Sequence, residues 1–286
     1  MRLYNIIKNV YFYKMLIIFT TCKPFKGHIG WKQEQSIKSW VNLNTDKKII
    51  IFGNDFGTKE ICEKYNLIHE SDIKTFNNNV PYIHDMFLIA SNYANDNDTL
   101  IWTNADMIYY DSFVKTINAF KETNSEIKDF ILVGQRFDWH NPCILTDLTE
   151  EYFKNNITYE HPTLTIKQYK EGDKFQGQLH APTGIDYVVH SKTTIVNNID
   201  KNLVIAGTGH DMIIVSSALR NNYYTCDITE TNFVVHHDHG YVKDVVFQER
   251  IKHNRSIYNQ NSLKGINNCI MKSIWDNQQI RFVRKE

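Results

Sequence analysis

Between Met15 and Trp139, short apolar segments rich in β-branched residues alternate with segments that have the spacing of amphipathic helices. Strands that are buried on both faces appear as continuous apolar runs, and strand–helix–strand units produce parallel pairing. The predicted strands cover 15–21, 47–55, 67–70, 99–110 and 129–139, and the predicted helices cover 31–43, 58–66, 80–94 and 111–120. This order predicts an α/β protein with a mainly parallel, Rossmann-like sheet that helices flank on both faces.

The alternation stops at residues 141–180, which are either an insertion that shapes a second substrate site or a long surface excursion. Neither an internal repeat nor a low-complexity linker divides the chain, so a single domain is predicted. We expect that domain to cover residues 15–246, after an N-terminal arm of residues 1–14 and before a C-terminal helical tail of residues 247–286. Met15 is an alternative start of translation to Met1.

Charge and cysteine content exclude several classes of protein. Lysine and arginine number 32, as do aspartate and glutamate, so no basic excess indicates a nucleic-acid partner. The five cysteines are scattered without a C-x-x-C pair, which indicates a reducing compartment rather than a disulfide framework. Arg2, Lys8 and Lys14 interrupt the apolar residues at the start of the chain. We therefore expect a cytoplasmic protein with no transmembrane segment.

Polar residues follow several of the predicted strands. In open parallel sheets, ligands bind beyond the carboxyl ends of the strands, so side chains from different strand ends converge there. The residues in question are Thr20, Thr21, Asn54, Asp55, Asn104, Asp106, Arg136 and Asp138. This edge of the sheet is the expected binding site.

Asn104 and Asp106 lie two residues apart after an apolar run, a spacing that places both side chains on one face of a strand. Their oxygen atoms suit Mg²⁺ or Mn²⁺. The chain has neither a G-x-x-x-x-G-K-[ST] loop nor a G-x-G-x-x-G turn after its first strand. An ion that assists the departure of a nucleotide diphosphate is the remaining interpretation. The alternative is that Asp106 caps a turn beside Asn104.

The order of these segments resembles the GT-A fold glycosyltransferases, which use nucleotide-diphospho-sugar donors. "IWTNADMIYYDSF" is similar to their D-x-D segment, and "FTTCKPFKGHIGWKQEQSIKSW", "IIIFGND", "ILVGQRFDW", "PTGIDYVVH", "GTGHDMIIVSSAL" and "FVVHHDHGY" occur in the family's order. The resemblance implies that Asp106 binds the metal. Asn104, in the first acidic place of the motif, would bond a ribose hydroxyl.

The resemblance also implies a set of donor contacts. Thr20, Thr21 and Asp55 would hold the nucleoside, and Arg136 would reach the donor. Lys23 would meet a phosphate, with a solvated loop lysine as the alternative. For Arg136, a buried ion pair with Asp138 is an equal alternative.

Two aspartates are candidates for the acceptor side. Asp211 opens a predicted helix after a glycine-rich turn, where inverting members of the resembled family place their general base. Its alternative role is an acid that caps this helix. Asp186 would contact the acceptor or the transferred sugar, or else is a turn residue before a strand.

The segment "NFVVHHDHGY" contains His236, His237 and His239. Their spacing is too tight for all of them to bind one tetrahedral zinc ion together with Asp238. The resemblance implies that a late histidine completes the metal site, and His236 or His239 is favoured. Surface histidines without a role are the alternative.

The sequence therefore predicts a metal-dependent, hexosyltransferase-like enzyme that uses Mn²⁺ or Mg²⁺. It would move a sugar from a nucleotide-diphospho-sugar, in particular a UDP-sugar, to a hydroxyl group of a glycan or glycoprotein. A catalytically inactive sugar-nucleotide or glycan-binding module on the same fold is the main alternative, and Asn104 supports it. A metal-dependent hydrolase that uses the histidine cluster is a second alternative.

Overall fold

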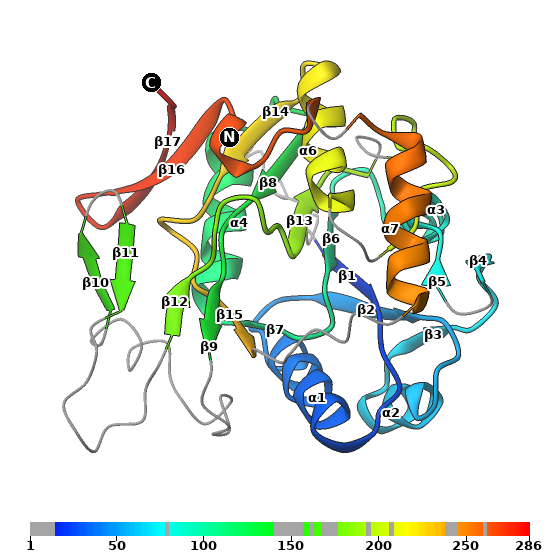
Figure 1. Cartoon of the computed structure of the whole chain (residues 1–286). Helices are drawn as coiled ribbons and strands as arrows, with labels where there is room; N and C mark the ends of the chain where they lie inside the picture. The colour runs from blue at the N-terminus through cyan, green and yellow to red at the C-terminus, as the bar shows by residue number, and fades with distance from the viewer. Residues whose placement is uncertain are drawn as a thin grey trace, which may run out of the picture.

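The computed structural model describes residues 15–77, 80–139, 157–160, 163–166, 177–192, 196–205, 209–237, 245–259 and 262–286. Its main feature is a nine-stranded sheet with the order β17-β16-β14-β8-β13-β6-β1-β2-β3 (Figure 1). These strands are β1 (Leu16–Thr21), β2 (Lys47–Phe52), β3 (Ile68–Glu70), β6 (Thr99–Thr103), β8 (Phe130–Val133), β13 (Tyr187–His190), β14 (Tyr224–Asp227), β16 (Met271–Asp276) and β17 (Gln279–Arg284).

Five of the eight strand pairings in this sheet are parallel. The exceptions are β13, which runs antiparallel to both β6 and β8, and the antiparallel pair β16–β17. The predicted α/β fold class with a mainly parallel sheet is confirmed. The antiparallel β13 was not predicted, because it enters from a second, smaller sheet rather than through a crossover helix.

Helices cover both faces of the sheet. They are α1 (Gly27–Val41), α2 (Thr58–Tyr65), α3 (Ile83–Asn92), α4 (Asp111–Thr123), α6 (His210–Arg220) and α7 (Val245–Ile257). One apolar core contains residues of α1, α2 and α4, and a second contains residues of α3 and α6. Alternate residues of β1 supply the two cores, Ile18 on one face and Ile17 and Phe19 on the other, as the two-residue period of a strand requires.

A four-stranded sheet with the order β12-β9-β15-β7 lies beyond the ends of β6 and β8. It contains β7 (Met107–Tyr109), β9 (Phe137–Trp139), β12 (Gly177–Leu179) and β15 (Val234–His237). The buried Trp40 of α1 donates its indole N–H to the carbonyl oxygen of Met107 at 2.7 Å, which ties α1 to β7. Two short antiparallel pairs, β4 (Thr75–Phe76) with β5 (Val80–Pro81) and β10 (Ile157–Glu160) with β11 (Thr163–Ile166), complete the strands.

The C-terminal tail differs from its prediction. The expected helix over residues 247–286 is present only as α7, which is followed by a short 3-10 helix, η3 (Ile266–Asn268), and by the β16–β17 hairpin. The hairpin, red in Figure 1, extends the main sheet because β16 pairs with β14. The prediction of a wholly helical tail is therefore wrong. A strand partner distant in sequence decides the conformation of such a weakly patterned segment.

None of the helices in the described part of the chain combines the length and apolar character that crossing a bilayer requires.

Candidate functional site

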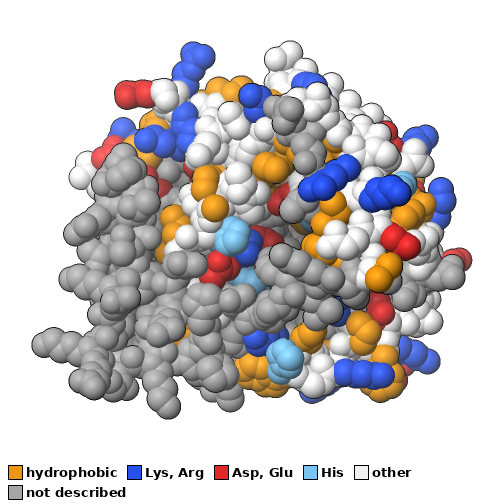
Figure 2. Space-filling view, in the orientation of Figure 1, with side chains coloured by type: hydrophobic (Ala, Val, Ile, Leu, Met, Phe, Trp, Pro, Cys, Tyr) orange, Lys and Arg blue, Asp and Glu red, His pale blue; other side chains and the backbone are white. Residues whose placement is uncertain are grey.

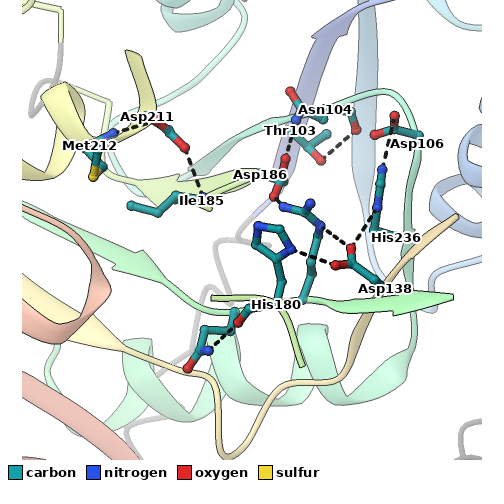
Figure 3. Close-up of polar contacts among 12 residues, drawn as sticks. Thr103, Asn104, Asp106, Asp138, His180, Ile185, Asp186, Asp211, Met212 and His236 are labelled. Carbon is teal, nitrogen blue, oxygen red and sulfur yellow. Dashed lines mark hydrogen bonds and ion pairs between the residues drawn. The ribbon is translucent and has the colours of Figure 1, made fainter. Parts of the chain in front are cut away.

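A network of charged and polar side chains lies at the carboxyl ends of β6 and β8 (Figure 3). We call it the charge network. Its members are Asn104, Asp106, Arg136, Asp138, His180, Asp186 and His236. They come from five separate segments of the chain, so only the folded structure brings them together.

The register of β13 explains how Asn104 meets Asp186. Tyr187 pairs with Thr103, which places the next residues out, Asp186 and Asn104, opposite one another. The backbone N–H of Asn104 donates to the carbonyl oxygen of Asp186 at 2.8 Å, and its side-chain amide donates to the Asp186 carboxylate at 2.5 Å. An aspartate at position 104 would face this carboxylate with a like charge, so the amide has a specific role as a donor.

Asn104 and Asp106 do not share one strand face. The chain turns between β6 and β7, and both residues lie in that turn. Asn104 faces Asp186, whereas Asp106 lies near His236. The predicted strand over residues 99–110 is thus two strands, and the two side chains contact different partners.

Arg136 occupies the centre of the charge network and is only 3% exposed. Its Nε donates to Asp138 Oδ1 at 2.9 Å, and its Nη1 forms an ion pair with Asp186. The structure therefore shows the buried ion pair that was one of the two interpretations of Arg136. Contact with a donor stays a prediction.

Asp138 accepts hydrogen bonds on both carboxylate oxygens. His236 Nδ1 and Arg136 Nε each lie 2.9 Å from Oδ1, and His180 Nδ1 lies 2.6 Å from Oδ2. Burial alone would raise the pKa of Asp138, but the hydrogen bonds from His180 and His236 and the charge of Arg136 outweigh it. They hold the pKa of Asp138 well below its usual range, so this carboxylate is ionised.

His236 is 4% exposed, and strand register sets its position. In β15 it pairs with Asp138 of β9 and with Met107 of β7, the residue after Asp106. Its Nε2 lies 3.5 Å from Asp106 Oδ2. Burial would lower the pKa of His236, but the charge of Asp106 and the hydrogen bonds to both carboxylates outweigh it and raise the pKa.

His180 is the functional candidate that the sequence did not reveal. It follows β12, and its side chain is 31% exposed. Its partner Asp138 lies 42 residues away in sequence, and the antiparallel pairing of β12 with β9 brings the two together. No motif marks this histidine, and the segment before it has no clear periodicity.

Asp211 lies in the first turn of α6, and both of its carboxylate oxygens bind backbone N–H groups. Oδ2 accepts from Ile185 at 3.0 Å, and Oδ1 accepts from Met212 at 2.9 Å. Asp211 therefore fixes the chain just before Asp186 to the start of α6 (Figure 3). The residue that precedes the helix is Gly209, so Asp211 is not itself the N-cap. Its catalytic role stays a prediction.

The predicted nucleoside contacts lie at the ends of β1 and β2. The hydroxyl groups of Thr20 and Thr21 donate to the carbonyl oxygens of Thr21 at 3.2 Å and Phe52 at 3.1 Å. Lys23 is exposed, and the side chain of Gln33 binds its backbone N–H and C=O groups.

Cys22 links this region to the charge network electrostatically. Burial raises the pKa of its thiol, and the charges of Cys62, Asp55 and Asp106 raise it further. Burial likewise raises the pKa of Asp55. The charges of Asp55 and Asp106 therefore both act on the Cys22 thiol.

His239 lies outside the described residues, as do Asp238 and the segment that follows it. His237 ends β15, but its side chain lies outside the described set as well. Within that set, no group of three or more histidine, cysteine, aspartate or glutamate side chains could hold a metal ion. Asp106 and His236 are the two predicted metal ligands that the structure brings together.

No protein-family model and no curated protein matches the sequence. Several solved structures match the chain at low sequence identity and with TM-scores below 0.5. Glucosyl-3-phosphoglycerate synthase from Mycobacterium tuberculosis, in complex with Mg²⁺ and UDP, is 8% identical with a TM-score of 0.44, over 96% of this chain and 87% of that one. TarS 1-349 from S. aureus, in complex with UDP, is 12% identical with a TM-score of 0.43, over 80% of this chain and 59% of that structure.

The 4-diphosphocytidyl-2C-methyl-D-erythritol synthase from Anaerococcus prevotii is 12% identical with a TM-score of 0.40. The match covers 86% of this chain and 96% of that protein.

Proposed function

We propose that the protein is a metal-dependent glycosyltransferase that moves a sugar from a nucleotide-diphospho-sugar to a hydroxyl group of a glycan or glycoprotein. The observation that carries the proposal is the relation of His236 to two carboxylates. Asp138 is ionised and accepts from Nδ1, and Nε2 lies 3.5 Å from Asp106 Oδ2, so a carboxylate lies beside each ring nitrogen and the pKa of His236 is raised. A divalent cation would take the place of the proton between Nε2 and Asp106, because a metal-binding histidine must give up that proton.

The residues present fit a hard divalent ion. Adjacent ligands of an octahedral ion, each about 2.1 Å from it, lie roughly 3 Å apart, which is close to the separation of Asp106 Oδ2 and His236 Nε2. A metal-bound histidine also donates its second ring N–H to a carboxylate, as His236 does to Asp138. Mg²⁺ commonly takes one or two protein carboxylates together with substrate phosphates. Asp106 and His236 would thus hold the ion, with His239 as a further predicted ligand.

When bound, Mn²⁺ or Mg²⁺ would neutralise the negative charge that develops on the departing nucleotide diphosphate. The chain's own groups would place the donor. Thr20, Thr21 and Asp55 would contact the nucleoside, and Lys23 would contact a phosphate. The predicted ribose contact of Asn104 would use its amide oxygen or its second N–H, because one N–H already binds Asp186.

Arg136 and Asp186 would contact the donor sugar or the acceptor. Arg136 is fixed by two carboxylates before any ligand binds, so its position costs no reorganisation during the reaction. Asp186 and Asp211 are the sequence candidates for acceptor contact. Asp211 controls the chain at Ile185, whereas the carboxylate of Asp186 belongs to the charge network.

The test is a thermal-shift screen of UDP-sugars and GDP-sugars with and without Mn²⁺. A donor that binds only the folded state stabilises it by an amount that increases with ligand concentration. We expect at least one nucleotide sugar to raise the melting temperature in the presence of Mn²⁺, and Asp106→Asn to abolish the Mn²⁺-dependent part. Asp96→Asn is the matched control, because the Asp96 side chain is 95% exposed. Unchanged Mn²⁺-dependent stabilisation in Asp106→Asn would contradict the assignment.

One observation favours a second function, a binding module without turnover. Position 104 is an asparagine whose amide N–H binds Asp186, and it offers an ion no carboxylate. Such a module would bind a nucleotide sugar but release no nucleoside diphosphate from it in the presence of Mn²⁺. Measured turnover would therefore exclude it.

A further inference from the structure

We propose that His180 is the general base that removes the proton from the attacking hydroxyl group. This inference rests on the transferase function proposed above and assigns a residue that the sequence motifs do not contain. The geometry is an aspartate–histidine pair, in which His180 Nδ1 lies 2.6 Å from Asp138 Oδ2 (Figure 3). Figure 2 shows acidic, basic and histidine side chains gathered near the middle of this face of the molecule.

The tautomer of His180 follows from the charge of its partner. Asp138 accepts hydrogen bonds from His236 and Arg136 as well, so it is an ionised carboxylate that can only accept from His180. The Nδ1 atom of His180 must then carry the proton, and Nε2 of the neutral ring bears the lone pair. An aspartate that holds the imidazole in this tautomer leaves Nε2 free to accept a proton, as in a catalytic triad.

The imidazole of His180 is also held in place. The backbone N–H of His180 donates to the carbonyl oxygen of Arg136 at 2.8 Å, and Gln135 Nε2 donates to the carbonyl oxygen of His180 at 2.5 Å. A Cβ on Gly184 would lie 2.3 Å from Cδ2 and 2.4 Å from Nε2 of the ring. Glycine at position 184 therefore leaves the space that the ring occupies. A base must be positioned within hydrogen-bond reach of its proton, and these contacts fix the ring.

His180 Nε2 is open to a substrate. The side chain is 31% exposed, and Nε2 has no hydrogen-bond partner among the described residues. The other candidates for the general base already contact more groups of the protein. Asp186 binds Asn104 and Arg136, Asp211 binds two backbone N–H groups, and His236 is close to a carboxylate on each ring nitrogen. Of these groups, His180 is best placed to receive a proton.

Two charged side chains lie near the His180 ring. Asp138 lies on the Nδ1 side. Arg136 is near Gly184, which the ring also borders, because a Cβ on Gly184 would lie 3.2 Å from Arg136 Nη1.

In the proposed step, the hydroxyl oxygen forms a bond to the anomeric carbon as the bond between that carbon and the diphosphate oxygen breaks. The hydroxyl proton moves to His180 Nε2, the bonding electrons leave with the nucleoside diphosphate, and the proton passes later to solvent.

The test compares a nucleophile that must lose a proton with one that need not. The parent protein and His180→Asn are each given UDP-glucose, UDP-galactose, UDP-N-acetylglucosamine or GDP-mannose with Mn²⁺. Water serves as the hydroxyl nucleophile, and sodium azide serves as a nucleophile without a proton. The asparagine amide can still donate to Asp138, and thermal melting checks the fold. His253→Asn, on α7, is the matched control because His253 is a partly exposed histidine outside the charge network.

We expect His180→Asn to lower donor hydrolysis by about 10²–10⁴-fold, the range for loss of one general base. Glycosyl azide, identified by mass spectrometry, should form at a rate near that of the parent, and the KM for the donor should change little. His180→Ala with added imidazole should recover part of the hydrolysis, which keeps the proposal testable if His180→Asn folds poorly.

Hydrolysis by His180→Asn at the parent rate would overturn the proposal. So would an equal loss of hydrolysis and azide transfer, because His180 would then act on the donor rather than on the proton. If the parent protein itself breaks down no donor, the transferase function fails, and the assignment of His180 fails with it. The parent reaction alone distinguishes this last case from the others.

Discussion

The carboxylate of Asp211 accepts a hydrogen bond from the backbone N–H of Ile185 at 3.0 Å, which joins the first turn of α6 to the residue before Asp186. The same carboxylate accepts from the N–H of Met212 at 2.9 Å. An aspartate predicted to be a base or a helix cap thus has a third role, because it positions a neighbouring segment of the site.

The first prediction concerns Asp211→Asn. One amide oxygen can replace only one of the two carboxylate acceptors, so one backbone N–H loses its partner. We expect a loss of stability of about 1 kcal/mol, measured by urea denaturation, and a larger loss for Asp211→Ala. Transfer should fall less than it does in His180→Asn. A fall of about 10²–10⁴-fold with normal donor binding would instead identify Asp211 as the base.

The second prediction concerns Asn104→Asp. The new carboxylate would face Asp186 in place of an amide donor, so the variant should be less stable by about 1–3 kcal/mol at pH 7. Adding Asp186→Asn should restore part of this stability, because the double variant has one donor and one acceptor again. Asn118→Asp, on the exposed side of α4, is the control. Equal stability of Asn104→Asp and the parent in denaturation curves would contradict the amide role.

The third prediction concerns Asp138→Asn. The ionised carboxylate orients His236 and His180 and neutralises part of the charge of Arg136. Loss of a carboxylate that orients a metal-bound histidine typically lowers metal affinity by about 10–100-fold. Calorimetric titration with Mn²⁺ in the presence of UDP measures this effect, with Asp96→Asn as the control. Unaltered Mn²⁺ affinity in a folded Asp138→Asn protein would separate His236 from the metal.

The fourth prediction concerns the pH dependence of stability. His190, at the end of β13, is fully buried; its ring stacks on Phe87 with ring centroids 5.0 Å apart. Burial lowers the pKa of His190 to about 4. The unfolded chain, in which a histidine has a pKa of about 6.5, binds a proton that the folded protein does not. The contribution of His190 to the free energy of unfolding is therefore fully present above about pH 6.5. It falls by about 1.4 kcal/mol per pH unit as the pH decreases toward 4.

His190→Phe removes the titrating group, so its stability should depend less steeply on pH over this window. Urea denaturation at pH 7, 6 and 5 measures the difference between the two proteins. Parallel curves for the parent and His190→Phe would show that His190 does not bind its proton selectively in the unfolded state.

Local sequence patterns predicted the parts of the fold that local forces determine. The apolar run before Asn104 corresponds to a buried strand, β6. The hairpin β16–β17 was missed because its stability depends on β14, a partner more than forty residues earlier in the chain. The orientation of β13 was missed because the segment before it carries no clear pattern.

The site was predictable to the same extent. Asp106 and His236 were expected together, and strand register places them together. The role of the Asn104 amide as a hydrogen-bond donor depends on the position of Asp186, 82 residues away. The proposed role of His180 as a base depends in the same way on the position of Asp138. The sequence does not show whether the hydrogen-bonding groups of a side chain already have partners, so these roles can be recognised only in the folded structure.

Because β13 runs antiparallel to β6 and β8, it determines which segments of the chain supply residues to the site at this edge of the sheet. Parallel strands deliver to one edge only the residues with which they end, such as those that follow β6 and β8. β13 delivers to the same edge the residues with which it begins, including His180 and Asp186 just upstream of it. The residues that follow β6 and β8 therefore form one half of this edge, and the residues that precede β13 form the other half. Changes in the chain before Gly177 can thus alter one half of the site without changing the strand ends that form the other.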